Sequence, residues 1–220
     1  MVDGFRFKFL GEDFVAFGSG SLHWPERSLL AFADLHLGKS RRVAREGRAL
    51  LPPFDDKETL DRMERDLKIA NATTVACIGD SFDDMRSAGE LESSTRDRLS
   101  EFADARRWRW IAGNHDPEPF GGGEWSDALH MPPFTFRHMA VPGESGEISG
   151  HYHPKASVGA AGRRISKKCF LFDGKKLILP AFGTYTGGLP SISRPLKTIM
   201  APSSIAILTG PTPRAIPMPR

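Results

Sequence analysis

Three short apolar runs in the first half of the chain each end in polar residues, and this pattern constrains the fold more than any other feature. The runs are LLAFAD (29–34), TTVACIG (73–79) and WRWIAG (108–113). Continuous apolar runs of this length predict strands buried on both faces, as in a parallel sheet. The segments between them carry helical patterns, so the order is β-α-β-α-β. This order favours a layered α/β fold.

The two intervening segments place their apolar residues at helical spacing. In the first, which follows an aspartate N-cap signal, the stripe consists of Leu60, Met63, Leu67 and Ala70. In the second, it consists of Leu91, Leu99, Phe102 and Ala103. We expect both segments to form amphipathic helices packed on the sheet.

The second half of the chain has a different character. FTFRH (134–138), CFLFDGKKLIL (169–179) and SSIAILTG (203–210) have the pattern of strands joined by turns, with a hairpin signal at Asp173-Gly174. We therefore expect a second, largely antiparallel sheet packed on the first. The proline-rich end, residues 211–220, is expected to be an irregular tail.

Length and composition indicate one globular domain over residues 1–220, because 40% of the 220 residues are hydrophobic. Cys77 and Cys169 are the only cysteines, which excludes a disulfide framework and a cysteine-based zinc site. The start of the chain has no apolar leader, and no window approaches the length of a membrane span. These features predict a cytoplasmic protein without a membrane partner.

The charge is unevenly distributed. The net charge is +3, but residues 55–104 hold 14 acidic and 7 basic residues, leaving 13 acidic and 23 basic residues elsewhere. Basic runs lie at 39–48, 106–109 and 162–168. Such runs suit a polyanionic partner and equally suit solvated loops, so charge alone does not decide between them.

The polar residues that follow the strands have the chemistry of a metal site. In α/β sheets, ligands bind beyond the carboxyl ends of the strands. If the chain stays extended there, residues two apart share a face, so Asp34 can join His36, and His151 can join His153. With Asp80, Asn114 and His138 these make seven ligands, enough for two cations sharing a carboxylate. Such a pair suits phosphoester hydrolysis, and a set without thiolate suits manganese, iron or zinc.

Five motifs, in this order, resemble the signature of the calcineurin-like metallophosphoesterases. They are DxH (Asp34, His36), GDxxD (Asp80, Asp83), GNHD (114–116 after Gly113), a lone His138, and GHxH (His151, His153). The resemblance implies a four-layer αββα sandwich, with two mixed sheets flanked by helices. It also implies one metal on Asp34, His36, Asp80 and His153, and a second on Asp80, Asn114, His138 and His151. Asp80 would bridge them, a metal-bridged hydroxide would attack phosphorus, and His115 would give a proton to the leaving oxygen.

A narrower resemblance covers nearly the whole chain. ADLHLGKS (33–40), GHYHPKA (150–156) and LPAFGTYTGG (179–188) are similar to segments of the ligase-associated DNA damage response endonucleases. This implies a cytoplasmic, manganese-type enzyme that acts on DNA and is linked to DNA-ligase repair proteins. That family commonly has a histidine where Asp83 stands, whereas Asp83 fits the GDxxD of the wider superfamily. We therefore expect Asp83 to orient His115.

The leading hypothesis is a dimetal phosphodiesterase of DNA, an endonuclease in repair. Lys39, Arg41 and Arg42 follow the DxH motif closely, so we expect them to bind the phosphate chain beside the metals. One alternative is a phosphomonoesterase or nucleotide phosphodiesterase acting on small molecules, because the same centre serves both. Another is a non-catalytic scaffold, which the complete set of ligands and His115 argues against.

Overall fold

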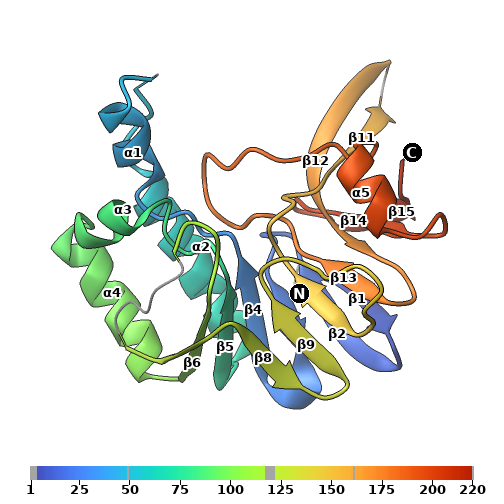
Figure 1. Ribbon diagram of the computed structural model, residues 1–220, viewed down its shortest axis with the longest axis horizontal. Coiled ribbons are helices and arrows are strands. Elements are labelled where there is room, and N and C mark those ends of the chain that lie inside the picture. The colour runs from blue at the N-terminus through green and yellow to red at the C-terminus, as the bar shows by residue number, and fades with distance from the viewer. Residues whose placement is uncertain (1–3, 49, 117–121, 161, 220) are drawn as a thin grey trace.

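The first sheet contains the three predicted buried strands. The structure, a computed structural model, describes residues 4–48, 50–116, 122–160 and 162–219. The first sheet has the order β1-β2-β3-β4-β5-β6-β7 (Figure 1). Pairing is antiparallel from β1 to β4 and parallel from β4 to β7. The strands are β1 (Gly4–Phe9), β2 (Glu12–Phe17), β3 (Leu22–Trp24), β4 (Leu29–Ala33), β5 (Thr74–Ile78), β6 (Arg107–Ile111) and β7 (Glu124–Ser126).

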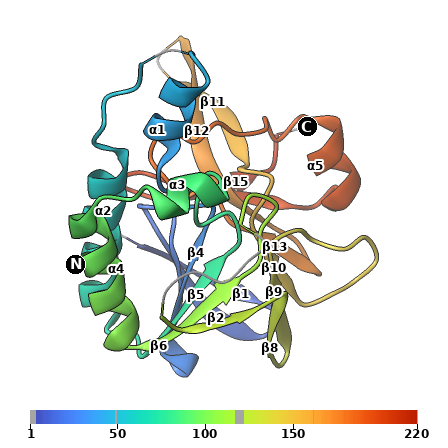
Figure 2. The ribbon, with the colours of Figure 1, turned by 60° about the vertical axis from the view of Figure 1, so that its left-hand side comes forward.

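Helices connect β4 to β5 and β5 to β6, as predicted. A short 3₁₀ turn, η1 (Pro25–Arg27), precedes β4, and the α-helices are α1 (Lys39–Arg45), α2 (Asp55–Ala70), α3 (Met85–Gly89) and α4 (Ser93–Asp104). In α2 the buried apolar residues are Leu60, Met63 and Leu67, which confirms three positions of the predicted stripe, while the fourth, Ala70, is partly buried against the same core. Figure 2 shows α2 and α4 side by side on one face of this sheet. In the described part of the chain, no helix is long and apolar enough to cross a membrane.

The second sheet is mixed, with mainly antiparallel pairs. Its order is β15-β14-β12-β13-β10-β9-β8, and β11 pairs with β12 outside that path. β10 is parallel to both β9 and β13. The predicted hairpin at Asp173-Gly174 joins β12 to β13. The strands are β8 (Ala128–Met131), β9 (Phe134–Arg137), β10 (Glu147–Ser149), β11 (Lys155–Ala160), β12 (Arg163–Phe172), β13 (Lys176–Ile178), β14 (Ile205–Leu208) and β15 (Arg214–Pro217).

Three clusters of apolar side chains fill the spaces between successive layers of the fold. The two sheets meet over a core rich in aromatic rings, in which Phe14, Trp24 and Phe134 lie with ring centroids 5.1 to 5.3 Å apart. A second core lies between the first sheet and its helices. A third lies between the second sheet and α5 (Arg194–Ile199), where Leu196 is fully buried. The predicted αββα sandwich is confirmed, with one short helix on its outer C-terminal face.

The end of the chain corrects one expectation. Composition predicts an irregular tail over residues 211–220, but Arg214–Pro217 forms β15, antiparallel to β14. Pairing is possible because β15 is the edge strand, where a proline that lacks an N–H leaves no partner unsatisfied. Arg220 lies outside the described residues. A single domain over residues 1–220 remains a prediction.

Candidate metal centre

The predicted ligands come together where several strands end. The parallel strands β4, β5 and β6 deliver their carboxyl ends to one edge of the first sheet, and β9 and β10 do the same for the second. From these ends come Asp34 and His36 after β4, Asp80 after β5, Asn114 and His115 after β6, His138 after β9, and His151 and His153 after β10. The site is therefore built at the seam between the two sheets.

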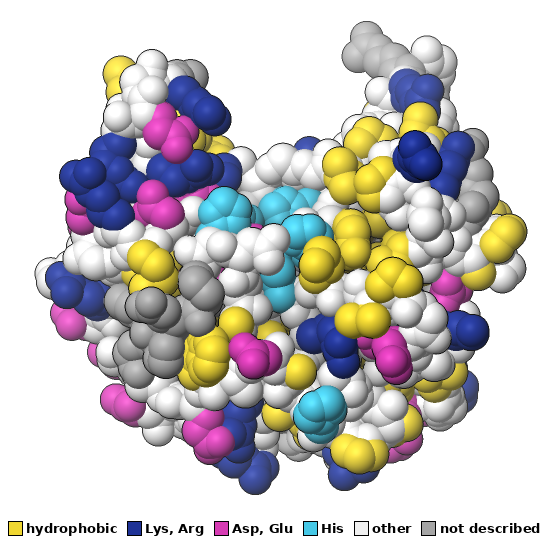
Figure 3. Space-filling view, in the orientation of Figure 1, with side chains coloured by type: hydrophobic (Ala, Val, Ile, Leu, Met, Phe, Trp, Pro, Cys, Tyr) yellow, Lys and Arg dark blue, Asp and Glu magenta, His cyan; other side chains and the backbone are white. Residues whose placement is uncertain are grey.

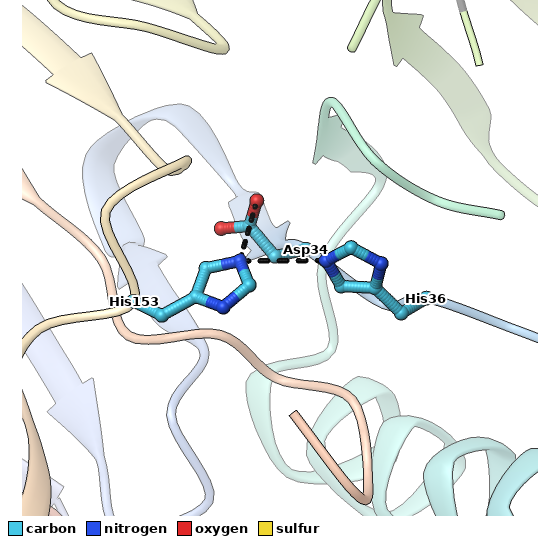
Figure 4. Close-up of side chains that lie close together, drawn as sticks. All are labelled: Asp34, His36 and His153. Atoms are coloured by element: carbon cyan, nitrogen blue, oxygen red, sulfur yellow. Dashed lines mark hydrogen bonds and ion pairs between the residues drawn. The ribbon is translucent and has the colours of Figure 1, made fainter. Parts of the chain in front are cut away.

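One group of side chains consists of Asp34, His36 and His153. Their ligand atoms all lie within 4.8 Å of one another. Nε2 of His153 is 3.3 Å from Oδ1 of Asp34 and 3.4 Å from Nε2 of His36 (Figure 4). Asp34 and His36 are buried, and His153 closes the group from the partly exposed side. Two imidazole nitrogens and a carboxylate oxygen thus face one point.

A second group consists of Asp80, His138 and His151, with ligand atoms again within 4.8 Å of one another. Nε2 of His138 is 3.3 Å from Oδ2 of Asp80 and 3.1 Å from Nδ1 of His151. Nδ2 of Asn114 lies 3.4 Å from the same His151 nitrogen, so the exposed Asn114 stands at the rim of this group.

Asp80 lies between the two groups. Its Oδ2 is 3.3 Å from Nε2 of His138 in one group and 3.9 Å from Nε2 of His36 in the other. Its Oδ1 accepts a hydrogen bond of 2.9 Å from the backbone N–H of His115. Burial opposes ionisation, but His138 and that amide outweigh it and hold the pKa of Asp80 below its usual range. This carboxylate is therefore charged and faces both groups.

Hydrogen bonds on the far side of two imidazoles direct their free nitrogens inward. Nδ1 of His36 donates to Oδ1 of Asp83 at 2.7 Å, and Nδ1 of His138 donates to the carbonyl oxygen of Ile78 at 3.4 Å. In the His36 ring Nε2 is then the lone-pair nitrogen, and in both rings Nε2 faces the ligand groups. Burial lowers the pKa of His36, which favours its neutral form. The donor set fits divalent cations of the manganese, iron or zinc type.

The backbone around the centre differs from the expected extended form. Asp34, His36, Asp80, His151 and His153 have φ values of 54°, 46°, 45°, 69° and 45°, in the left-handed region. Asp34 and His36 converge through these turns and not through strand alternation, so the predicted meeting is confirmed and its predicted cause is wrong. Gly150 is required at its position, because a Cβ there would overlap the Asp34 carboxylate.

Asp83 has a different partner from the one expected. It is fully buried, and its carboxylate accepts hydrogen bonds from His36 Nδ1, from Lys39 Nζ at 2.9 Å and from Arg42 Nε. Burial would raise the pKa of Asp83, but these three donors hold it below its usual range. The expectation that Asp83 orients His115 is thus corrected, since the carboxylate orients His36. The His115 ring is exposed, with its centroid 5.3 Å from that of His36.

The basic residues after the DxH motif also differ from expectation. They lie on α1, but their charges are compensated by carboxylates. Lys39 and Arg42 bind Asp83, while Nη1 of Arg41 is 2.6 Å from Asp56. Any phosphate binding by Lys39, Arg41 and Arg42 has to compete with these ion pairs. In the structure their contacts support the DxH segment.

Sequence reasoning missed a buried lysine beneath the centre. Nζ of Lys168 donates to the carbonyl oxygens of Ala181 and Gly183, at 2.8 and 2.9 Å, and to Oγ1 of Thr186 at 2.7 Å. The N–H of Gly183 in turn donates to the carbonyl oxygen of Asp34 at 3.1 Å. Burial lowers the pKa of Lys168 to about 7. The only signal was its place in the basic run 162–168, which says nothing of burial.

Comparison with known families settles the family. Residues 27–195, which include every residue of the centre, match the model of the calcineurin-like phosphoesterases. The chain belongs to this family. Calcineurin-like phosphoesterases hydrolyse phosphoesters with divalent metals, and the two groups described above are the candidate metal sites of this one. The protein is a metal-dependent phosphoesterase.

A solved structure of a nuclease agrees with this assignment. The phosphoesterase superposes on the Pseudomonas putida nuclease MPE with a TM-score of 0.75 and 25% identity, covering 96% of this chain and 100% of that one. Yfce, a phosphoesterase from E. coli, gives a TM-score of 0.43 at 12% identity over 87% of this chain and 99% of that one. A search of curated proteins finds no matching sequence.

Proposed function

We propose that this phosphoesterase is a dimetal phosphodiesterase that cleaves the DNA backbone. The observation that carries the proposal is the pair of adjacent ligand groups with Asp80 facing both. Two cations held close together suit in-line displacement at a phosphodiester. The full-length similarity to a nuclease supports nucleic acid as the substrate.

The residues present fit two cations. One would take Asp34, His36, Asp80 and His153, and the other Asp80, Asn114, His138 and His151. When bound, the pair polarises the phosphoryl oxygens and lowers the pKa of a water molecule. Manganese is the proposed metal, with iron and zinc as alternatives, because histidine nitrogen and carboxylate oxygen suit all three.

His115 is the proposed general acid. Its backbone is fixed by the bond to Asp80, and its exposed ring lies beside His36 at the open side of the centre. A proton donor to the leaving oxygen needs this position, next to the reacting phosphate and open to solvent for reprotonation. His115 belongs to neither candidate metal group.

The shape of the molecule favours a long substrate over a small one. Figure 3 shows a hollowed face with a group of histidine side chains at its floor, between two projections. In Figure 1 these projections are the α1 segment on one side and the β11–β12 hairpin on the other. A chain of nucleotides can cross such an open trough, whereas a small phosphomonoester would gain nothing from its walls. A role in DNA repair alongside a DNA ligase is part of the proposal and rests on the narrower family resemblance.

The proposal is tested by parallel assays of one preparation. The protein is stripped of metal, reconstituted with manganese, iron or zinc, and assayed on a phosphomonoester, a small phosphodiester and plasmid DNA. We expect metal-dependent cleavage of the diester and the plasmid, with little activity on the monoester. Preference for the monoester would support the small-molecule alternative. No hydrolysis with any metal would support the scaffold.

A further inference from the structure

The β11–β12 hairpin leaves the second sheet as a free two-stranded ribbon. Only Cys169–Phe172 of β12 pairs with β14, whereas Arg163–Lys168 pairs with β11 and no other strand. The base of the ribbon is tied down, because Thr209 donates to the carbonyl oxygen of Lys168 and Lys155 bridges to Pro190. The ribbon has six residue pairs, from Lys155↔Lys168 to Ala160↔Arg163, and so extends about 20 Å. In Figure 1 it rises on the opposite side of the molecule from α1. An isolated ribbon gains little stability from its own pairing.

One face of the ribbon is directed toward the metal centre. Lys168 reaches the loop whose Gly183 N–H holds the Asp34 carbonyl, so the Lys168 face is the face toward the trough. Side chains two apart on a strand share a face, so Ser166 and Arg164 lie on it too. Their cross-strand partners Lys155, Ser157 and Gly159 complete this face.

The other face of the ribbon points away from the trough. At its base Ala156 is fully buried in the core beneath α5. Ala156 pairs with Lys167, and Val158 pairs with Ile165, so these residues share that side. The exposed Lys167 therefore offers a comparison to Arg164, since both lie on the same strand but on opposite faces.

The charge of the ribbon is uncompensated. Residues 154–172 include no acidic residue, and their basic residues are Lys155, Arg163, Arg164, Lys167 and Lys168. Among the residues that the structure describes, no carboxylate pairs with the side chain of Lys155, Arg164 or Lys167. On α1 the situation is the reverse, because Lys39, Arg41 and Arg42 are all held in ion pairs. Uncompensated cations bind phosphates without first breaking an internal ion pair.

We infer that the trough face of the β11–β12 ribbon, formed by Lys155, Ser157, Gly159, Arg164 and Ser166, binds the phosphate backbone of a nucleic-acid substrate. The inference rests on the proposed function and assigns its substrate contacts to the ribbon in place of α1. Basic side chains and serine hydroxyls are groups that contact phosphate oxygens. Gly159 meets open space, so a strand can approach the ribbon closely there.

A matched pair of charge reversals, Arg164→Glu and Lys167→Glu, tests the inference. Both change the net charge equally in the same exposed segment. Binding is measured on metal-loaded protein, by inhibition of small-diester hydrolysis with a single-stranded oligonucleotide and by anisotropy of the labelled oligonucleotide over a salt series. We expect Arg164→Glu to weaken binding several-fold more than Lys167→Glu and to flatten the salt dependence by about 0.7 log units for each phosphate that is no longer bound. Both variants should hydrolyse the small diester normally, which also shows that they fold.

The outcomes separate this inference from the proposed function. Equal weakening by the two variants, or none, overturns the ribbon face as the binding surface even if the protein cleaves DNA. Conversely, an oligonucleotide that binds in an Arg164-dependent way but is never cleaved overturns the nuclease assignment and leaves the binding surface in place. Loss of small-diester hydrolysis in Arg164→Glu alone would place Arg164 in the catalytic site and also overturn the inference.

Discussion

Nδ1 of His36 donates a hydrogen bond of 2.7 Å to Oδ1 of Asp83, a carboxylate that also binds Lys39 and Arg42. The bond fixes the tautomer of His36, a proposed metal ligand, and the positive side chains of Lys39 and Arg42 keep the Asp83 carboxylate charged. Asp83 therefore links the basic residues of α1 to the centre.

The first prediction concerns this link. Asp83→Asn removes the charge opposite His36, and we expect the affinity for one metal to fall about 10- to 100-fold. Calorimetric titration with manganese measures it. Asp84→Asn is the matched control, because the neighbouring Asp84 caps α3 and binds Arg45 without contacting a proposed ligand. Normal metal affinity in Asp83→Asn, with turnover lost only on poor leaving groups, would restore a role in orienting His115.

Asp80→Asn should weaken both metals, because its carboxylate faces both ligand groups. Asn114→Ala should weaken mainly one, since Asn114 contacts only the group of His151. Metal content after dialysis, measured for both variants and the unmodified protein, checks this difference. A single equivalent of metal in the unmodified protein would rule out the dimetal centre.

His115→Ala should lower turnover by about 10²- to 10⁴-fold on a substrate with a poor leaving group. The loss should shrink on a good leaving group, whose oxygen leaves without a proton. Metal content should be unchanged, because His115 lies outside both candidate groups. Equal impairment on good and poor leaving groups would show that His115 is not the proton donor.

Lys168 should make folding stability depend on pH. Its pKa is about 7 in the folded protein, below the ordinary value of 10.5 that applies to the unfolded chain. Between pH 7 and about 10.5 the lysine is protonated in the unfolded chain but neutral in the folded protein, so the free energy of unfolding rises with pH. Below pH 7 the lysine is charged in both states, and the folded protein bears the full cost of the buried charge. The slope should reach about 1.4 kcal/mol per pH unit.

Lys168→Met, which is similar in length and has no charge, isolates this contribution. Urea unfolding of both proteins from about pH 6 to about pH 10 should show the unmodified protein gaining stability relative to the variant as pH rises. The metal ligands are common to both, so their titration cancels. Parallel curves would mean that the three acceptors of Lys168 keep its ammonium charged throughout.

The sequence pattern predicted the buried strands and the metal-binding residues that follow them. Burial of β4 and β5 is visible in uninterrupted apolar runs, and the placement of Asp34 and Asp80 follows from where those runs end. β6 is buried less completely, because Arg107 and Arg109 interrupt its apolar residues. Pairing between distant side chains is not visible in this way. The sequence could not show that Asp83 would meet His36 and not His115, because that choice depends on the path of the loop after β5.

Two other differences have a similar origin. Short spacing on the chain correctly placed the basic residues of α1 near the site, but the acidic partner of Arg41 lies 15 residues away, on α2. Local composition predicted an irregular end, whereas β15 forms because a sheet edge is available to it. In both cases the deciding interaction is a pairing between two elements, and local composition does not show which partner an element will meet.

The left-handed backbone at five proposed ligands creates a conflict between metal binding, which catalysis needs, and the stability of the fold. Each such residue costs on the order of 1 kcal/mol that a glycine would not incur, so an exchange at a partly exposed ligand, such as His151→Gly, would relieve strain while removing a ligand. Laboratory evolution of this protein for heat resistance in chelator would therefore accumulate inactive survivors. With the metal present at about 100 times its Kd, the free energy of unfolding of every variant that still binds it would rise by about 2.7 kcal/mol. The same selection would then favour variants that keep the metal ligands.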